Sequence, residues 1–272
     1  MPTRTAGRDR QAPSSKSVTR LATHQFRYDL VAFARNGQSR FFTIALPVIF
    51  LVIFASVFKG TVTVPGGSIK ISVFYVPGII TLGIIAASFV NPIISITAQR
   101  ETGVLKRRRA TPVPASAIIA GRALTATVTA LFITGVLLLI GWIFFKAHVP
   151  ATTAPALVLA VVIGTMSFGC MAYGVASLIH DQDSAQPITQ AIMLPLYFIS
   201  GVFIPTSQLP HWLSDISKVF PVRHLAAALL GAYNPHTSGA GIAGWDLLIV
   251  AVWGLAGLVL ALRRFSWVPL GR

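Results

Sequence analysis

Long apolar runs, separated by short polar segments, are the main pattern along this chain. Apolar and polar residues do not alternate within the runs, so the runs do not resemble the strands of a membrane barrel. A helix of roughly 17–25 mostly apolar residues can cross a bilayer with its backbone hydrogen-bonded internally. The pattern therefore predicts an all-α polytopic membrane protein with six transmembrane helices, at about 41–58, 72–97, 117–145, 155–179, 188–204 and 245–262.

The segment at about 205–234 is apolar in part but does not suit a seventh span. It contains Pro210 and Pro221, and also Lys218 and Arg223. Proline interrupts a helix, and charged side chains are costly in the bilayer core. We expect short helices here that enter one membrane interface and turn back, as a re-entrant outer hairpin.

Two patterns occupy the N-terminal region. Residues 1–17 are basic and contain serine and proline, which predicts a disordered tail. From about 18 to 36, Phe26, Leu30 and Phe33 recur at helical spacing beside arginines. This spacing predicts an amphipathic helix on the inner leaflet. The alternative is a solvated arm that only sets the topology.

Composition supports a membrane protein and indicates its orientation. The 272 residues are 54% hydrophobic and 11% charged, with a mean hydropathy of +0.73, whereas soluble domains are about a quarter charged. Of the 22 Lys and Arg residues, 17 lie within residues 1–40, in or just after the loop that follows the second run, or in the C-terminal tail. Such an excess marks cytoplasmic segments, so both termini are predicted to be cytoplasmic. The same clustering accounts for the net charge of +15 without a nucleic-acid partner.

Motifs for catalysis and ATP binding are absent from the sequence. It has no G-x-x-x-x-G-K-[ST] phosphate-binding loop, and its one cysteine, Cys170, has no zinc-site spacing around it. The predicted spans carry almost no charged side chain, since Asp246 lies only at the edge of one, and this scarcity disfavours transport coupled to protons or sodium ions. We expect no catalytic residue, metal or cofactor in this chain, so that a separate motor would supply the energy.

The most charged stretch joins the second and third runs and reads "AQRETGVLKRRRATPVP", residues 98–114. Its four consecutive basic residues would cost on the order of 10 kcal/mol at the bilayer centre, so the loop must lie in water or at headgroups. "RETGVLKRR" can form a short helix, which Pro112 and Pro114 would end. A charged cytoplasmic segment joined to two long helices could dock into a motor and transmit its motion.

Three stretches, in chain order, resemble one known family. They are "YVPGIITLGIIAASFVNPIISI", "QRETGVLKRRRATPVPASAIIAGRAL" and "SAQPITQAIMLPLYFISGVFIPTSQLPHWLSDISKVFPVRHLAAALLG". The second is similar to that family's signature loop, an ERE-T-G-x-L-x-x-L-x-x-T-P pattern. With these stretches the chain resembles, from about Arg20 to Arg264, the membrane subunits of the ABC type-2 transporter family. These are bacterial drug- and antibiotic-exporting permeases, including the daunorubicin-resistance type.

The resemblance implies an assembly and a docking site. Six spans would pair with a second permease subunit, identical or a sister chain, and with two nucleotide-binding ATPase subunits that bind ATP and Mg. The signature loop, about residues 99–112, would act as a cytoplasmic coupling helix. The residues that would contact or orient the ATPase are Arg100, Glu101, Thr102, Gly103, Leu105 and Pro112. This chain departs from the family at Arg107, Arg108 and Arg109, where an apolar residue is common; with Lys106 they would favour an acidic groove on the partner.

The resemblance also implies a transport path between the two permease subunits, lined by the second and fifth helices. We take five side chains as candidates for this lining, and ordinary helix packing is the alternative for the aromatic ones. An amide in lipid needs a partner, but Asn91 precedes a proline and could instead repair backbone bonds at a kink. The candidates are Phe89, Asn91, Tyr197, Phe198 and Phe203.

Together these observations predict one transmembrane domain over residues 18–272, in a bacterial plasma membrane. Its expected function is that of the permease subunit of an ATP-driven exporter of amphipathic small molecules, such as a drug, an antibiotic or a lipid. Two alternatives are a permease for lipid-linked polysaccharide and a membrane scaffold or assembly factor that transports nothing.

Overall fold

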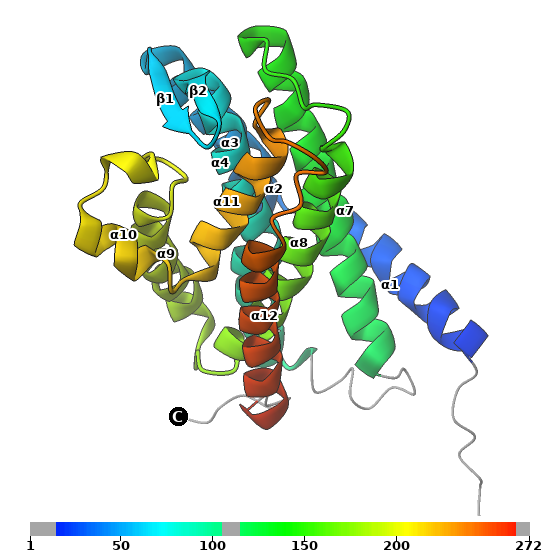
Figure 1. Ribbon diagram of the computed structural model, residues 1–272. Coiled ribbons are helices and arrows are strands. Elements are labelled where there is room, and N and C mark those ends of the chain that lie inside the picture. Colours follow the sequence, from blue (N-terminus) through cyan, green and yellow to red (C-terminus); the bar gives the residue numbers. More distant parts are fainter. Residues whose placement is uncertain (1–14, 105–114, 265–272) are drawn as a thin grey trace, which may run out of the picture.

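The computed structural model describes residues 15–104 and 115–264 (Figure 1). The tail that was expected to be disordered lies mostly outside these ranges, but its last residues are helical because α1 begins at Ser15. The first part of the described chain contains α1 (Ser15–Arg35), α2 (Gly37–Arg40), the π-helix η1 (Phe41–Ala45), α3 (Leu46–Val57), β1 (Thr61–Val64), β2 (Gly67–Lys70), α4 (Ile71–Ile85), the π-helix η2 (Ala86–Val90) and α5 (Asn91–Glu101). The second part contains α7 (Ala115–Phe145), α8 (Ala154–Ala176), α9 (Gln182–Ile199), the 3-10 helix η3 (Thr206–Gln208), α10 (His211–Ser217), α11 (Pro221–Tyr233) and α12 (Gly244–Arg264).

The described helices match the predicted apolar runs with two differences in length. The first run forms only a shorter apolar helix, Thr43–Val57. The fifth run forms α9, which begins before the run and ends at Ile199 because Gly201 turns the chain with φ +82°. The described segments that are long and apolar enough to cross a membrane are Ile71–Glu101, Gly121–Phe145, Ala154–Ala176 and Gly244–Arg264.

The continuous helix made of α4, η2 and α5 forms the centre of the bundle. Every residue from 74 to 90 is buried, and α3, α7, α8 and α11 pack around this helix (Figure 1). By contrast, α7 and α12 keep large apolar side chains such as Phe144 and Leu262 exposed. The burial pattern therefore separates a central helix from helices whose outer faces would meet lipid or another subunit.

Two π-helical turns interrupt the first and second predicted spans, and each is followed by a proline. Pro47 comes after η1 and Pro92 after η2. Proline lacks the N–H that would continue the α-helical ladder, and a π-bulge is one way in which a helix absorbs such an irregularity. The two turns are also joined, because Asn91 Nδ2 donates to Thr43 Oγ1 in η1. The amide thus finds its partner on another span and not on a freed backbone group.

Glycines bring α8 and α12 into direct backbone contact. A Cβ atom added to Gly257 would lie 2.5 Å from Cα of Met171, and one added to Gly174 would lie 2.6 Å from the carbonyl oxygen of Gly257. Small residues allow this approach in membranes, where helices gain little from the hydrophobic effect. Gly164 instead faces Leu225 of α11, so the glycines of α8 serve different neighbours.

The prediction of an all-α protein is wrong for residues 61–70, which form an antiparallel β-hairpin. Thr61 pairs with Lys70 and Val64 with Gly67. The sequence carries a signal for it, since "TVTV" alternates and "PGG" is a turn sequence. Asn234 Nδ2, just after α11, donates to the carbonyl oxygen of Pro65 at 2.9 Å. The hairpin is therefore fixed to the segment that leads into α12.

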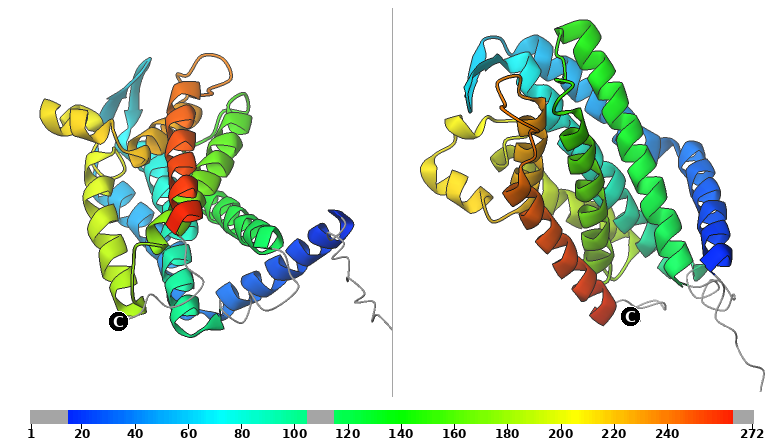
Figure 2. Two further views of the ribbon diagram at one scale, coloured as in Figure 1. Left: turned by 90° about the horizontal axis from the view of Figure 1, so that it is seen from below. Right: turned by 45° about the vertical axis from the view of Figure 1, so that its right-hand side comes forward.

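The bundle has two distinct ends (Figure 1). One, the hairpin end, carries β1 and β2 and the loop between α11 and α12. The other, the turn end, carries the turn between α8 and α9 and the last residues of α5 and α12 (Figure 1). The predicted N-terminal helix exists as α1, which packs along α7 at the side of the bundle (Figures 1 and 2). The helices α10 and α11 join α9 to α12.

Candidate functional site

Arg100, in the last turn of α5, projects into the turn end of the bundle. Its side chain is 1% exposed, yet its guanidinium is well paired: Nη1 donates to the carbonyl oxygen of Ala176 at 3.1 Å, and Nη2 donates to those of Ile179 and His180. The last carbonyls of a helix have no partner within that helix and carry its partial negative charge. A buried arginine therefore closes the C-terminal end of α8.

Glu101, the next residue, acts on the opposite kind of helix end. Its carboxylate accepts a hydrogen bond from the backbone N–H of Gln182 at 2.8 Å, and Gln182 is the first residue of α9. The first N–H groups of a helix are unpaired and carry partial positive charge. Two consecutive side chains of α5 thus pair with the ends of two helices: Arg100 with the carbonyl end of α8, and Glu101 with the N–H end of α9. We call this arrangement of Arg100, Glu101 and their backbone partners the clamp.

Asp181 completes the turn between α8 and α9. It is the N-cap of α9, with Oδ1 accepting from the N–H of Ser184 at 2.7 Å and Oδ2 from its hydroxyl at 2.9 Å. These hydrogen bonds from Ser184 lower the pKa of Asp181. The start of α9 is therefore held from two sides, by its own cap and by Glu101.

Thr102 and Gly103 end α5 and lead into the loop. The hydroxyl of Thr102 donates to the carbonyl oxygen of Ala98 at 2.8 Å, and Gly103 has φ +70°. An added Cβ atom at Gly103 would meet nothing within 4 Å, so the left-handed backbone alone requires glycine here. The helix expected over about 99–112 therefore differs at its start, because its first residues belong to α5 and the break comes at Gly103.

The rest of the predicted ATPase-binding set lies outside the described residues. A further hydrogen bond joins α5 to α7, because Arg122 donates to Oε1 of Gln99. Of the predicted set, Arg100 and Glu101 come together with the α8–α9 turn, Thr102 is exposed and Gly103 is half-buried. The residues outside are Leu105, Lys106, Arg107, Arg108, Arg109 and Pro112.

The five candidates for the transport path separate into two groups. Tyr197 and Phe198 both lie against Phe203, with ring centroids 6.1 and 5.2 Å apart. Phe89 instead packs edge-on against Phe168 of α8, and Asn91 bonds to η1. Of the aromatic candidates, Phe198 is exposed, whereas Phe89, Tyr197 and Phe203 are buried within the subunit. Tyr197, Phe198 and Phe203 thus form one aromatic cluster at the end of α9.

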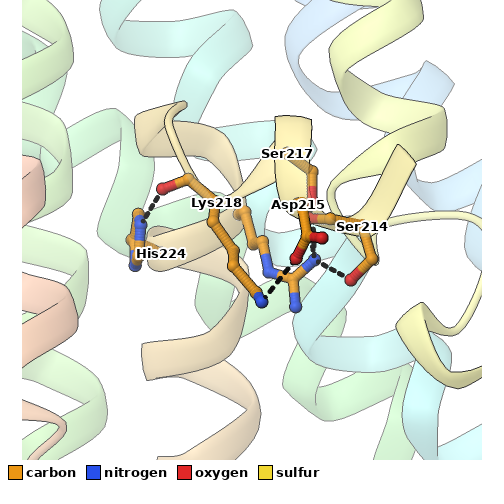
Figure 3. A network of polar contacts seen from close by, with 6 residues as sticks. Ser214, Asp215, Ser217, Lys218 and His224 are labelled. Atoms are coloured by element: carbon orange, nitrogen blue, oxygen red, sulfur yellow. Dashed lines mark hydrogen bonds and ion pairs between the residues drawn. The ribbon is translucent and has the colours of Figure 1, made fainter. Parts of the chain in front are cut away.

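Sequence reasoning missed a polar network between α10 and α11 (Figure 3). Arg223 Nη1 donates to the backbone carbonyl and hydroxyl oxygens of Ser214, at 3.1 and 3.0 Å, and to the hydroxyl of Ser217. Lys218 Nζ pairs with Asp215 at 2.7 Å, and both side chains are largely exposed. The individual residues are visible in the sequence, but no motif signals that they meet.

His224 connects this network to α12. Its Nε2 lies 2.7 Å from the carbonyl oxygen of Lys218 (Figure 3), and its Nδ1 lies 2.6 Å from Oδ1 of Asp246. The carbonyl can only accept, so Nε2 donates to it. We call these residues, Ser214 to Lys218 with Arg223, His224 and Asp246, the α10–α11 network.

A metal centre finds no support in the described part of the chain. No group of three or more His, Cys, Asp or Glu side chains there could hold an ion. The chemistry of the turn end is instead that of charged side chains on helix termini, which binds and orients segments of protein.

Comparison with known proteins gives a consistent family. The sequence profile described as "ABC-2 type transporter" matches residues 24–234. The "Probable multidrug ABC transporter permease YbhR" of Escherichia coli (strain K12) is 27% identical over 196 residues, which is 70% of this chain and 52% of that protein. The "Daunorubicin resistance ABC transporter permease protein DrrB1" of Streptomyces coeruleorubidus is 24% identical over 251 residues, 89% of this chain and 83% of that protein. The chain thus spans about half the length of the first relative. Because the profile covers most of the sequence, the chain belongs to the ABC-2 type transporter family.

Proposed function

We propose that this chain is the membrane subunit of an ATP-driven exporter of amphipathic small molecules such as drugs, antibiotics or lipids. The observation that carries the proposal is the clamp, which joins the signature loop, from Thr102 onward, to the helix bundle through buried and backbone contacts. A loop held in this way can pass a mechanical displacement to the spans. The multidrug and daunorubicin-resistance names of the two relatives support this class of cargo.

The proposed topology has six spans, with the turn end in the cytoplasm. The four long apolar helices would be joined by the shorter Thr43–Val57 helix and by α9. The excess of Lys and Arg in the N-terminal region, the signature loop and the C-terminal tail supports this orientation. The hairpin end would then face outward, with α10 and α11 as the re-entrant outer piece. The membrane would be a bacterial plasma membrane.

The energy would come from a separate nucleotide-binding ATPase subunit that holds ATP and Mg. This chain would dock that subunit with the loop from Thr102 to Pro112. The basic run Lys106, Arg107, Arg108 and Arg109 would favour an acidic groove. A second permease subunit, identical or a sister chain, would cover part of the exposed apolar faces, and lipid would cover the remainder.

Co-purification and export measurements with the ATPase test this proposal. The permease would be co-expressed with a neighbouring P-loop protein, purified, and reconstituted into vesicles with a panel of amphipathic compounds. We expect one or more compounds to stimulate ATP hydrolysis and to be moved across the membrane in an ATP-dependent manner. A complex that binds the ATPase but moves none of them would favour the scaffold alternative, and movement of lipid-linked polysaccharide alone would favour that permease class.

A matched pair of charge reversals tests the docking site. Changing Arg107, Arg108 and Arg109 to glutamate should abolish co-purification of the ATPase. The control changes Arg263 and Arg264, which end α12 at the same end of the bundle, to glutamate. We expect the control to retain the ATPase. Equal retention by both variants would place the docking surface elsewhere.

A further inference from the structure

We propose that the clamp passes movement of the signature loop to the start of α9, so that Arg100 and Glu101 act as positioning residues inside the permease. This inference rests on the proposed function, because it needs an ATPase that moves the loop. It goes further by naming the helix that receives the movement. The route through α5 and α7, from the second to the third span, is the competing possibility.

The burial of Arg100 is the first observation for this route. Arginine is almost never fully buried unless it is paired, and a buried charge needs its donors satisfied. In the described part of the chain, the hydrogen bonds of this guanidinium go to the backbone carbonyl that ends α8 and to two in the turn that follows it. A side chain so enclosed cannot at the same time be a surface contact for a partner. Its role is internal.

The contact between Glu101 and α9 is the second observation. The carboxylate bonds a backbone N–H and not another side chain, so a displacement of α5 acts on the helix itself. The two helices also pack against each other. Gly103, only two residues further on, has the left-handed conformation that starts the loop. The loop therefore begins immediately after the bond that holds α9.

The far end of α9 gives the movement a destination. Tyr197 and Phe198 lie near the end of this helix, and both meet Phe203 in the aromatic cluster. Phe203 also stacks on Phe54 of α3, with ring centroids 5.3 Å apart. A shift at Gln182 would thus change how the fifth span meets the first. The route runs from the loop to Glu101, then to α9, and then to the aromatic cluster.

The competing route offers a matched comparison. Arg122 of α7 bonds the side chain of Gln99 in α5, so it links α5 to α7 in the way that Glu101 links α5 to α9. If α9 receives the movement, loss of the Glu101 bond should uncouple the transporter and loss of the Arg122 bond should not. The reverse result would identify α7 as the receiver.

The test uses the full permease–ATPase complex in vesicles and measures ATP hydrolysis and export separately. We expect Glu101→Ala to keep the ATPase bound and hydrolysing while export per ATP falls at least about tenfold. Glu101→Gln keeps an acceptor oxygen and should retain most of the export. Arg122→Met is the control and should export like the wild type. Wild-type export by Glu101→Ala would overturn the inference.

A chemical rescue separates positioning from a general loss of structure. In a Cys170→Ala background, Glu101→Cys with Gln182→Cys removes the bond, and a short bifunctional thiol reagent can replace it. Export should be low before cross-linking and recover after it. The control pair, Gln99→Cys with Arg122→Cys, should export well before the reagent is added and gain nothing from it. A doubly substituted clamp that exports normally without the reagent, or stays inactive with it, would contradict the proposed route.

Failure of this inference is distinguishable from failure of the proposed function. If the wild-type complex neither binds an ATPase nor moves any cargo, the proposed function is wrong. If the wild type exports and the clamp variants export equally well, only the route through α9 is wrong. The melting temperature and the ATPase content of each variant show that it is folded and assembled.

Discussion

The clamp and the α10–α11 network are both polar clusters between helices, but they are built from different partners. The clamp sets charged side chains against the backbone termini of α8 and α9. The α10–α11 network joins mostly side chains to one another, and its Lys218–Asp215 pair is exposed. A bond to a helix end acts on the whole helix, whereas a bond between exposed side chains fixes only a local turn. On the proposed route the first cluster would transmit movement between helices, whereas the second fixes the corner between α10 and α11.

Replacing the two arginines should give the largest contrast between the clusters. Arg100→Met leaves buried carbonyls of α8 without their donor, and we expect the free energy of unfolding to fall by about 3 kcal/mol. Arg223→Met also removes three hydrogen bonds, but at a half-buried site that water can reach, so we expect a loss of about 1 kcal/mol. Thermal and denaturant unfolding of the purified permease would measure both. Equal losses would remove the distinction.

The bond between the network and α12 should have an intermediate effect. Asp246→Ala removes the carboxylate that pairs with Nδ1 of the buried His224, and we expect a cost of about 1–2 kcal/mol. Trp253→Phe is a useful control, because it keeps an aromatic ring on α12 but removes the bond from Nε1 to the carbonyl oxygen of Val219. Its cost should be lower. Both variants should retain the ATPase, since neither touches the turn end.

Gly103→Ala tests whether the chain needs a left-handed backbone where α5 ends. No atom obstructs a methyl group there, so the cost comes from the left-handed conformation and should be about 1 kcal/mol. Gly135→Ala is the matched control, because this glycine lies within α7 and also has nothing within 4 Å. Alanine should be neutral or stabilising at that helical position. A similar loss at both sites would argue against a required left-handed turn.

The exposed pair in the α10–α11 network should have the smallest effect, and only a pH-dependent one. The hydrogen bond from Lys218 and the attraction of its charge lower the pKa of Asp215. A carboxyl whose pKa falls on folding adds stability above its ordinary value of about 3.9 and loses that contribution as the pH drops below it. Wild type and Asp215→Asn should therefore differ slightly at neutral pH and converge in acid. Melting temperatures across the pH range would show this, and a difference that grew in acid would contradict it.

Sequence patterns predicted the local features of this chain well. Apolar runs located the long helices that the structure describes. The clamp could not be predicted, because Arg100 and its acceptor Ala176 are 76 positions apart and the acceptor is a carbonyl that every residue has. The π-helical turns also lacked a pattern beyond Pro47 and Pro92. The β-hairpin did have a signal in "TVTV", which the apolar runs on either side obscured.

The backbone contact between α8 and α12 determines which parts of the bundle can move. At Gly257 and Met171 the two helices come into backbone contact, so a change of side-chain rotamers alone does not let one slide past the other. We therefore expect α8 and α12 to move as one unit. Because Arg100 is bonded to the end of α8, a movement passed through Glu101 on the proposed route would tilt α9 relative to the α8–α12 pair.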